Sequence, residues 1–200
     1  MDGRRPSAFF LALCLAASPQ AWAKWTESPL LPDYLRLHSG GGSGLIALGA
    51  GYGFWRDRIE PELMIGMVPE PVGGETIHSI SQRTAFTPFR LDLASSLFLF
   101  PLSVGYAANA GLGEDFRVLP MGRYRDYYWP SGLYFWFFGG ARLRKNFPSQ
   151  RLLSALSFSV DVGTLGAYLE ANLENERIGW FDILSLALSL QAHLGLLSGP

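Results

Sequence analysis

Side chains that could carry chemistry recur at every second position in several segments of the chain. Seven of them lie on the more polar face of a segment in which polar and apolar residues alternate: Glu60, Glu62, Arg142, Arg144, Asp161, Gln191 and His193. Carboxylates beside a histidine are the residue types of general acid–base catalysis. The same set could instead fill a protein interior as an ion-pair network, because buried charges must be paired. We expect the network, since charge clusters of this kind are often structural.

A second candidate is the stretch Ile77-His78-Ser79-Ile80-Ser81, which holds the residue types of a nucleophile–base pair. In a strand, His78 points to the face opposite Ser79 and Ser81, so neither hydroxyl easily reaches its ring. His78 and Ser81 are therefore weak catalytic candidates. We expect a structural histidine here, or one close to a loop.

Other motifs give little support for a bound group. The run Gly40–Gly44 lacks the Lys-Ser/Thr ending of a phosphate-binding loop. No Cys/His cluster has metal spacing, so we expect neither a metal nor a cofactor. In the connector over 109–131, Arg117, Arg123 and Arg125 could hold phosphates of lipopolysaccharide, because guanidinium groups fit phosphate. Three acidic residues in the same connector favour instead a loop whose charges pair with one another.

The composition narrows the class of protein. The chain has 200 residues, of which 48% are hydrophobic and only 16% are charged, so it can bury enough apolar surface to fold. The 16 basic and 17 acidic residues leave a formal charge of -1, which argues against a nucleic-acid binder. A single Cys excludes a disulfide scaffold.

The first segment has the pattern of a secretory signal. Arg4 and Arg5 precede an apolar stretch over 8–17 that is too short to span a bilayer as a helix. Ala21-Trp22-Ala23 then offers a small-x-small cleavage site. We expect residues 1–23 to be a signal peptide and 24–200 to form a single barrel domain.

The rest of the chain alternates with a period of two, which is typical of strands. The expected strands cover 34–38, 44–56, 59–68, 76–88, 94–108, 132–144, 151–162 and 181–196. In most of them one face is bulky and apolar, while the other is small or polar; the alternation is less clean over 94–108 and 132–144 and weakest over 76–88. After a signal peptide, long strands with one apolar face predict an all-β fold, an antiparallel up-and-down transmembrane β-barrel of about eight strands whose apolar side faces lipid. A barrel of this size holds only its own side chains, so we do not expect a wide aqueous pore.

The fifth expected strand is the irregular one. It places Phe98, Phe100, Leu102, Val104 and Tyr106 on one face, and Pro101 suggests a bulge or distorted pairing. The connectors fall into two sets. Those after the odd strands (40–43, 69–75, 109–131 and 163–180) are mostly long, and those after the even strands (57–58, 89–93 and 145–150) are short, as in outer-membrane barrels.

A helical alternative remains open. Residues 93–113 form a run of 21 without a charge, and residues 183–200 a run of 18, so both are long enough for a transmembrane helix. The positions of Ser157, Ser159 and Asp161 oppose this reading, because they would spread around a helix but line one face of a strand.

The order of elements resembles the lipid A deacylase (acyloxyacyl hydrolase) family of eight-stranded outer-membrane barrels. The stretch IHSISQRTAFTPFRLDL, followed by LFLFPLSVGYAANAG, carries the resemblance, which is one of layout over most of the mature chain. That family has a His-x-Ser motif on its seventh strand. The comparable stretch here is Val160-Asp161-Val162-Gly163-Thr164, so no catalytic residue is carried over.

We therefore expect a small outer-membrane β-barrel with a structural or loop-mediated binding role and no catalytic centre. Its expected location is the outer membrane of a Gram-negative-type envelope, after removal of the signal peptide. Its expected partners are membrane lipid, lipopolysaccharide and the outer-membrane assembly machinery, and not nucleic acid. Two alternatives stay open, a lipid A-modifying acyl hydrolase of deacylase type and a helical inner-membrane protein. If the chain is an enzyme, a lipid A or ester hydrolase is the expected class.

Overall fold

The structure is a computed structural model that describes residues 31–74, 76–112, 132–147, 152–174 and 179–195. These residues lie almost entirely in one compact unit, Pro32–Pro200. The expected signal peptide over 1–23, and Arg117, Arg123 and Arg125 of the long connector, lie outside the described residues.

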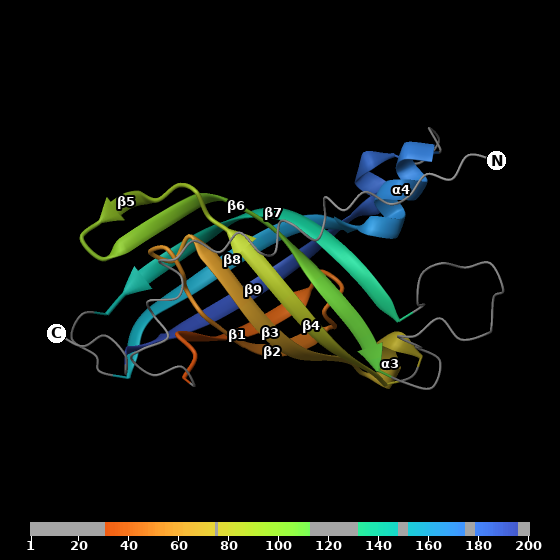
Figure 1. The fold of residues 1–200 in the computed structure, drawn as a ribbon, viewed down its shortest axis with the longest axis horizontal. Coiled ribbons are helices and arrows are strands. Elements are labelled where there is room, and N and C mark those ends of the chain that lie inside the picture. Colours follow the sequence, from red (N-terminus) through yellow and green to blue (C-terminus); the bar gives the residue numbers. More distant parts are fainter. Residues whose placement is uncertain (1–30, 75, 113–131, 148–151, 175–178, 196–200) are drawn as a thin grey trace. The chain divides into compact units, whose positions relative to one another are not determined.

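Eight antiparallel strands close into a barrel (Figure 1). They are β1 (Tyr34–Gly40), β2 (Ile46–Gly51), β3 (Ile59–Val68), β4 (Ile77–Phe86), β6 (Leu97–Leu112), β7 (Leu133–Asn146), β8 (Leu153–Leu165) and β9 (Leu184–Leu194). Each pairs with its neighbours in the chain, and two further pairings, β1 with β9 and β4 with β6, close the sheet. The predicted all-β, antiparallel eight-stranded barrel is confirmed.

The helical alternative is wrong for the residues that the structure describes. Most of the uncharged run 93–113 lies in β6, and 184–194 of the second run form β9. Within the described residues, no helix is both long and apolar enough to cross a membrane.

The strands are staggered around the barrel. A row of directly opposed residues leaves β6 at Leu99, passes through β7, β8, β9, β1, β2, β3 and β4, and returns to β6 at Ala110. The two ends of this row are therefore eleven residues apart on one strand. Such a stagger goes with strands tilted by roughly 35–45° from the barrel axis.

A bulge interrupts β6, and it corrects the predicted face of that strand. Between Phe100, opposite Arg142, and Ser103, opposite Gly140, β6 contains one residue more than β7. The extra residue lies next to Pro101, which has no N–H to give to the ladder. Phe100 is consequently buried inside, while Val104 is exposed outside, so these two residues do not share a face as predicted.

The connectors also differ from the prediction at two places. The expected short turn over 89–93 overlaps β5 (Leu91–Ala94), which pairs with the start of β6, beyond the end of β4 (Figure 1). The second strand ends at Gly51 and not near residue 56. Trp55, Arg56 and Asp57 have φ values of 52°, 60° and 61°, which a strand cannot contain.

The other set of connectors carries the short helices. They are α3 (Glu70–Gly73), α4 (Gly166–Glu174) and the 3₁₀ turn η2 (Trp180–Ile183). These elements follow β3 and β8, both of which run toward the same end of the barrel.

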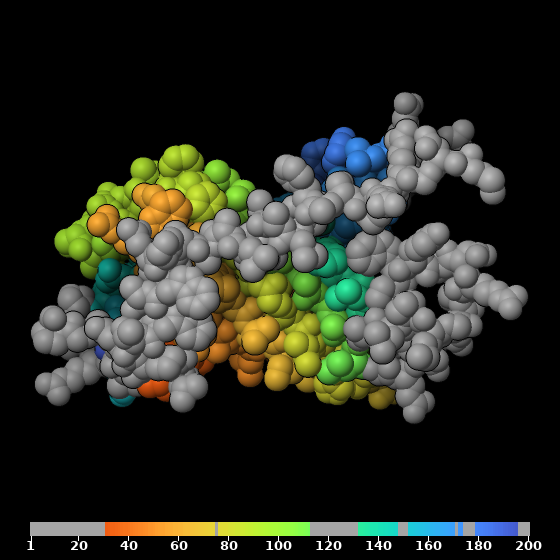
Figure 2. Space-filling view, viewed as in Figure 1, coloured from red at the N-terminus to blue at the C-terminus, as the bar shows by residue number. Residues whose placement is uncertain are grey.

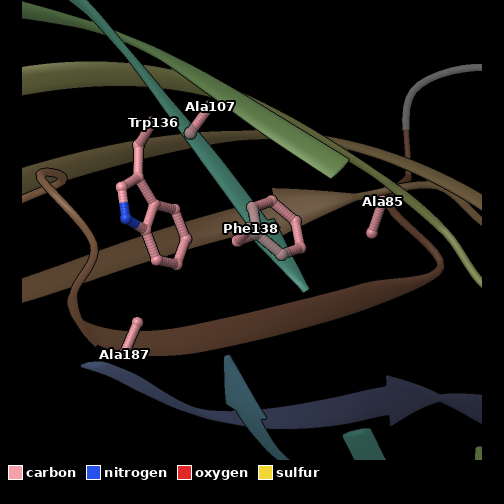
Figure 3. Close-up of a cluster of buried hydrophobic side chains, with 5 residues drawn as sticks. All are labelled: Ala85, Ala107, Trp136, Phe138 and Ala187. Carbon is pink, nitrogen blue, oxygen red and sulfur yellow. The ribbon is translucent and has the colours of Figure 1, made fainter. Parts of the chain in front are cut away.

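A small aromatic cluster fills part of the interior. Trp136 and Phe138 stack with ring centroids 4.9 Å apart, and alanines 85, 107 and 187 pack around them (Figure 3). A narrow barrel needs such small neighbours beside large rings. At Gly163, for example, an added Cβ would lie 2.7 Å from the Trp136 ring.

Candidate functional site

Six charged side chains are buried in the barrel interior. They are three arginines and three carboxylates, each at most 4% exposed: Arg36, Arg83, Arg142, Glu60, Glu62 and Asp161. They come from five different strands, and alternation along each strand directs them inward. Their formal charges cancel, which is what a low-dielectric interior requires.

One half of this interior network is centred on Glu62. Its two carboxylate oxygens accept hydrogen bonds from Arg36 Nε at 2.7 Å and from Arg83 Nη1 at 3.0 Å. Arg83 reaches across the barrel with its Nη2 to Asp161 Oδ2 at 2.8 Å. The guanidinium of Arg83 also lies 4.1 Å from the centroid of the Phe138 ring. The network thus extends directly from the aromatic cluster.

The other half is centred on Glu60. Arg142 donates to both carboxylate oxygens of Glu60, and Gln191 donates to Glu60 Oε2 at 3.4 Å. Arg142 also donates to Gln191 Oε1 at 3.3 Å. Arg36 Nη2, 3.9 Å from Glu60 Oε2, links the two halves.

This geometry suits a network that holds the strands together better than it suits acid–base catalysis. Each carboxylate is held by a guanidinium, and none is exposed to a substrate outside the barrel. A general base must be able to reach the proton that it removes. The interior network instead ties strands β1, β3, β4, β7 and β8 together across the barrel, and Gln191 adds β9 to them.

The predicted polar residues do not all join this network. Glu60, Glu62, Arg142, Asp161 and Gln191 belong to it. His193 instead contacts Ser157, with its Nε2 2.9 Å from the hydroxyl. Arg144 donates at 2.8 Å to Asp57, which lies in the connector between β2 and β3.

The structure separates the two weak catalytic candidates. His78 is exposed on the outer face, whereas Ser81 is fully buried inside. His78 and Ser81 therefore form no nucleophile–base pair.

The barrel does contain two Ser–His contacts that the sequence analysis missed. The first joins His38 Nδ1 to Ser189 Oγ at 2.9 Å, and the second is the contact of His193 with Ser157. His38 and Ser189 face each other only because β1 pairs with β9, which a local pattern does not reveal. All four residues are at most 5% exposed, so no substrate outside the barrel reaches them.

The glycine-rich run folds into one end of the barrel as a plug turn, residues 40–45. Ser43 is fully buried, its hydroxyl donates to Asn109 Oδ1 at 3.1 Å, and its carbonyl accepts from Ser79 at 2.7 Å. The Tyr134 hydroxyl donates to the carbonyl of Gly42 at 2.7 Å. Gly41 has a φ of 58°, and a Cβ there would lie 2.8 Å from the Trp136 ring, so glycine suits both the conformation and the space.

No bound group is indicated in the part of the chain that the structure describes. Among those residues, no group of three or more His, Cys, Asp or Glu side chains could hold a metal ion. Arg117, Arg123 and Arg125, the candidates for a contact with lipopolysaccharide, lie outside the described residues. The chain matches no protein-family model, no curated protein and no solved structure.

Proposed function

We propose that this chain is a membrane-spanning β-barrel of the outer membrane, with a closed interior and a structural role that includes holding its connectors at the membrane surface. The observation that carries the proposal is the outer face of the barrel. The row of opposed residues that circles the barrel is apolar at every position. It consists of Leu91, Leu99, Leu143, Phe158, Leu190, Leu37, Leu48, Ile65, Ile80 and Ala110.

Most of these side chains are open to the surroundings. Leu48 and Ile65 are 65% and 68% exposed, and Phe158 on the opposite part of the sheet is 48% exposed. The side chains that point inward from the same strands include those of the interior network. A soluble protein has the reverse arrangement, and it rarely exposes a continuous apolar band.

Lipid hydrocarbon is the surrounding that suits such a band. A closed barrel satisfies its backbone hydrogen bonds between strands, so it can be solvated by hydrocarbon. The strands β3, β4, β6, β7, β8 and β9 have 10 to 16 residues. They are long enough to cross a bilayer, because a tilted strand needs about 9–11 residues to do so. Ion pairs inside are compatible with a soluble or a membrane barrel. The apolar outer face formed by the outward side chains of the eight strands, which we call the outer band, favours the membrane.

The interior supports a structural role over transport. Paired charges occupy the middle, and the plug turn occupies one end. We therefore expect no solute flux through the barrel.

Refolding into lipid vesicles tests the proposal. We expect the chain, diluted from urea into phosphatidylcholine vesicles, to float with them, to resist extraction with alkaline carbonate, and to migrate differently on gels before and after boiling. We expect no conductance above that of protein-free bilayers. In cells of its source, the mature chain should be recovered in the outer-membrane fraction. A chain that is monodisperse in buffer without detergent, and does not float, contradicts the proposal.

A further inference from the structure

The outer band has one polar interruption, on β4 and β6. Setting aside the two residues at each strand end, the outward polar groups of the described strands are confined to Gln82, Thr84 and the hydroxyl of Tyr106. Thr84 lies directly opposite Tyr106, and Gln82 lies opposite Ala108. We call these four residues the polar seam. Figure 2 shows the side of the barrel on which β3, β4 and β6 lie next to one another.

The hydrogen bonds of the polar seam are incomplete. The amide Nε2 of Gln82 donates to the Thr84 hydroxyl oxygen at 2.7 Å. This bond leaves the amide oxygen Oε1 as an acceptor and the hydroxyl hydrogen of Thr84 as a donor. The described residues offer neither of them a further partner, and lipid hydrocarbon cannot supply one.

We propose that the polar seam is the contact between two copies of this chain in the bilayer, an inference that rests on the proposed function. A copy related by a twofold axis presents the same donor and acceptor in reverse order. The Thr84 hydroxyl of each copy then donates to the Gln82 amide oxygen of the other. A neutral, self-complementary pair of this kind fits a second copy better than a charged partner.

The surroundings of the seam allow a close approach. Ala108 stands between Gln82 on β4 and Phe135 on β7 in directly opposed positions. Its small side chain lets a second barrel approach the seam between larger neighbours. Contacts in membranes use small residues together with hydrogen-bonding side chains in this way.

Site-specific cross-linking in vesicles tests the contact. The background is the full chain with Cys14→Ser, since Cys14 is its single cysteine. We expect Ala108→Cys to give a covalent dimer with a short bis-maleimide. Leu188→Cys should not, because it faces outward on β9, four strands away from β4 around the sheet.

A second pair of variants tests the hydrogen bonds. In the Ala108→Cys background, Gln82→Leu with Thr84→Val should lower the cross-linked fraction in dilute vesicles, with a dissociation constant raised roughly tenfold. Thr84→Ser retains the hydroxyl and should keep the dimer. The double variant removes polar groups from a lipid-facing surface, so it should still insert.

Flotation and gel migration of the same samples separate the possible failures. Equal cross-linking at residues 108 and 188, or an inserted chain that stays monomeric at every protein-to-lipid ratio, overturns the inference alone. The second result would leave a lipid polar group as the occupant of the seam. A chain that does not insert overturns both this inference and the proposed function.

Discussion

Residues that are adjacent in the sequence form the interior and the exterior of this barrel, and the two sides differ in burial and in polarity. On β9, Leu190 is 41% exposed, while the next residue, Gln191, is 1% exposed and bonded to Glu60. On β4, Arg83 is buried between two outward neighbours, Gln82 and Thr84. The interior contains the charged network beside a small aromatic cluster, whereas the outer side chains are mostly apolar, an arrangement that soluble proteins seldom have.

This difference shows which interactions each side depends on. The interior tolerates charge because every guanidinium meets a carboxylate, so specific partners matter there. The exterior depends on the surrounding medium, since many of its leucines and isoleucines are exposed. Substitutions inside should therefore change the stability by removing charged or hydrogen-bonding partners. Substitutions outside should change it according to whether the new side chain is in water or in lipid.

The largest expected effect comes from breaking the interior network. Arg83→Met removes one of the two partners of Glu62 and the guanidinium that holds Asp161, and we expect a loss of about 3–5 kcal/mol of stability. Urea unfolding in detergent micelles, followed by tryptophan fluorescence, measures it. Arg90→Met is the matched control, since Arg90 pairs with Asp92 in an exposed position and should cost about 1 kcal/mol or less. Equal losses for the two variants would mean that the network is not cohesive.

The second-largest expected effect tests whether the outer face of the barrel contacts lipid or water. Leu190→Arg places a charge in the middle of the outer band and should cost about 2–4 kcal/mol in a bilayer. Leu152→Arg, at a 71% exposed position between β7 and β8, should have little effect. Reversible unfolding of both variants in vesicles gives the comparison. A Leu190→Arg variant as stable as the parent would indicate that this surface is in water.

The smallest expected effect comes from substitutions at two adjacent glycines on β7, where an added Cβ would lie on opposite sides of the sheet. An added Cβ at Gly140 would lie 2.2 Å from Asp161 Oδ1 and 2.3 Å from the carbonyl of Val160. We therefore expect Gly140→Ala to cost about 1–3 kcal/mol through overpacking. At Gly139 the nearest atom is 3.8 Å away, and Gly139→Ala should stabilise the chain by about 0.5 kcal/mol. Thermal unfolding in detergent should place the two variants on opposite sides of the parent, and the same sign for both would contradict the assigned faces.

Much of the fold could be predicted because alternation is a local signal. The inward positions of Glu60, Glu62, Asp161 and Gln191 follow from their spacing along each strand. The face of Phe100 could not be predicted in the same way, because one extra residue at a bulge reverses every later position. The prediction of a turn over 89–93 was wrong for a related reason. The four-residue strand β5 forms there because it pairs with the start of β6, and the local sequence does not reveal that pairing.

The sequence by itself determined which side chains would share a face if the chain forms strands, because successive side chains of a strand point to opposite faces. Only the tertiary structure decided which polar side chains meet. Arg36, Glu62, Arg83 and Asp161 come from four strands, and the stagger of a closed sheet brings them into one network. Closure likewise placed Ser189 beside His38 and folded the glycine run inward as a plug turn. Contacts of this kind depend on register and closure, which are properties of the whole sheet and not of any segment.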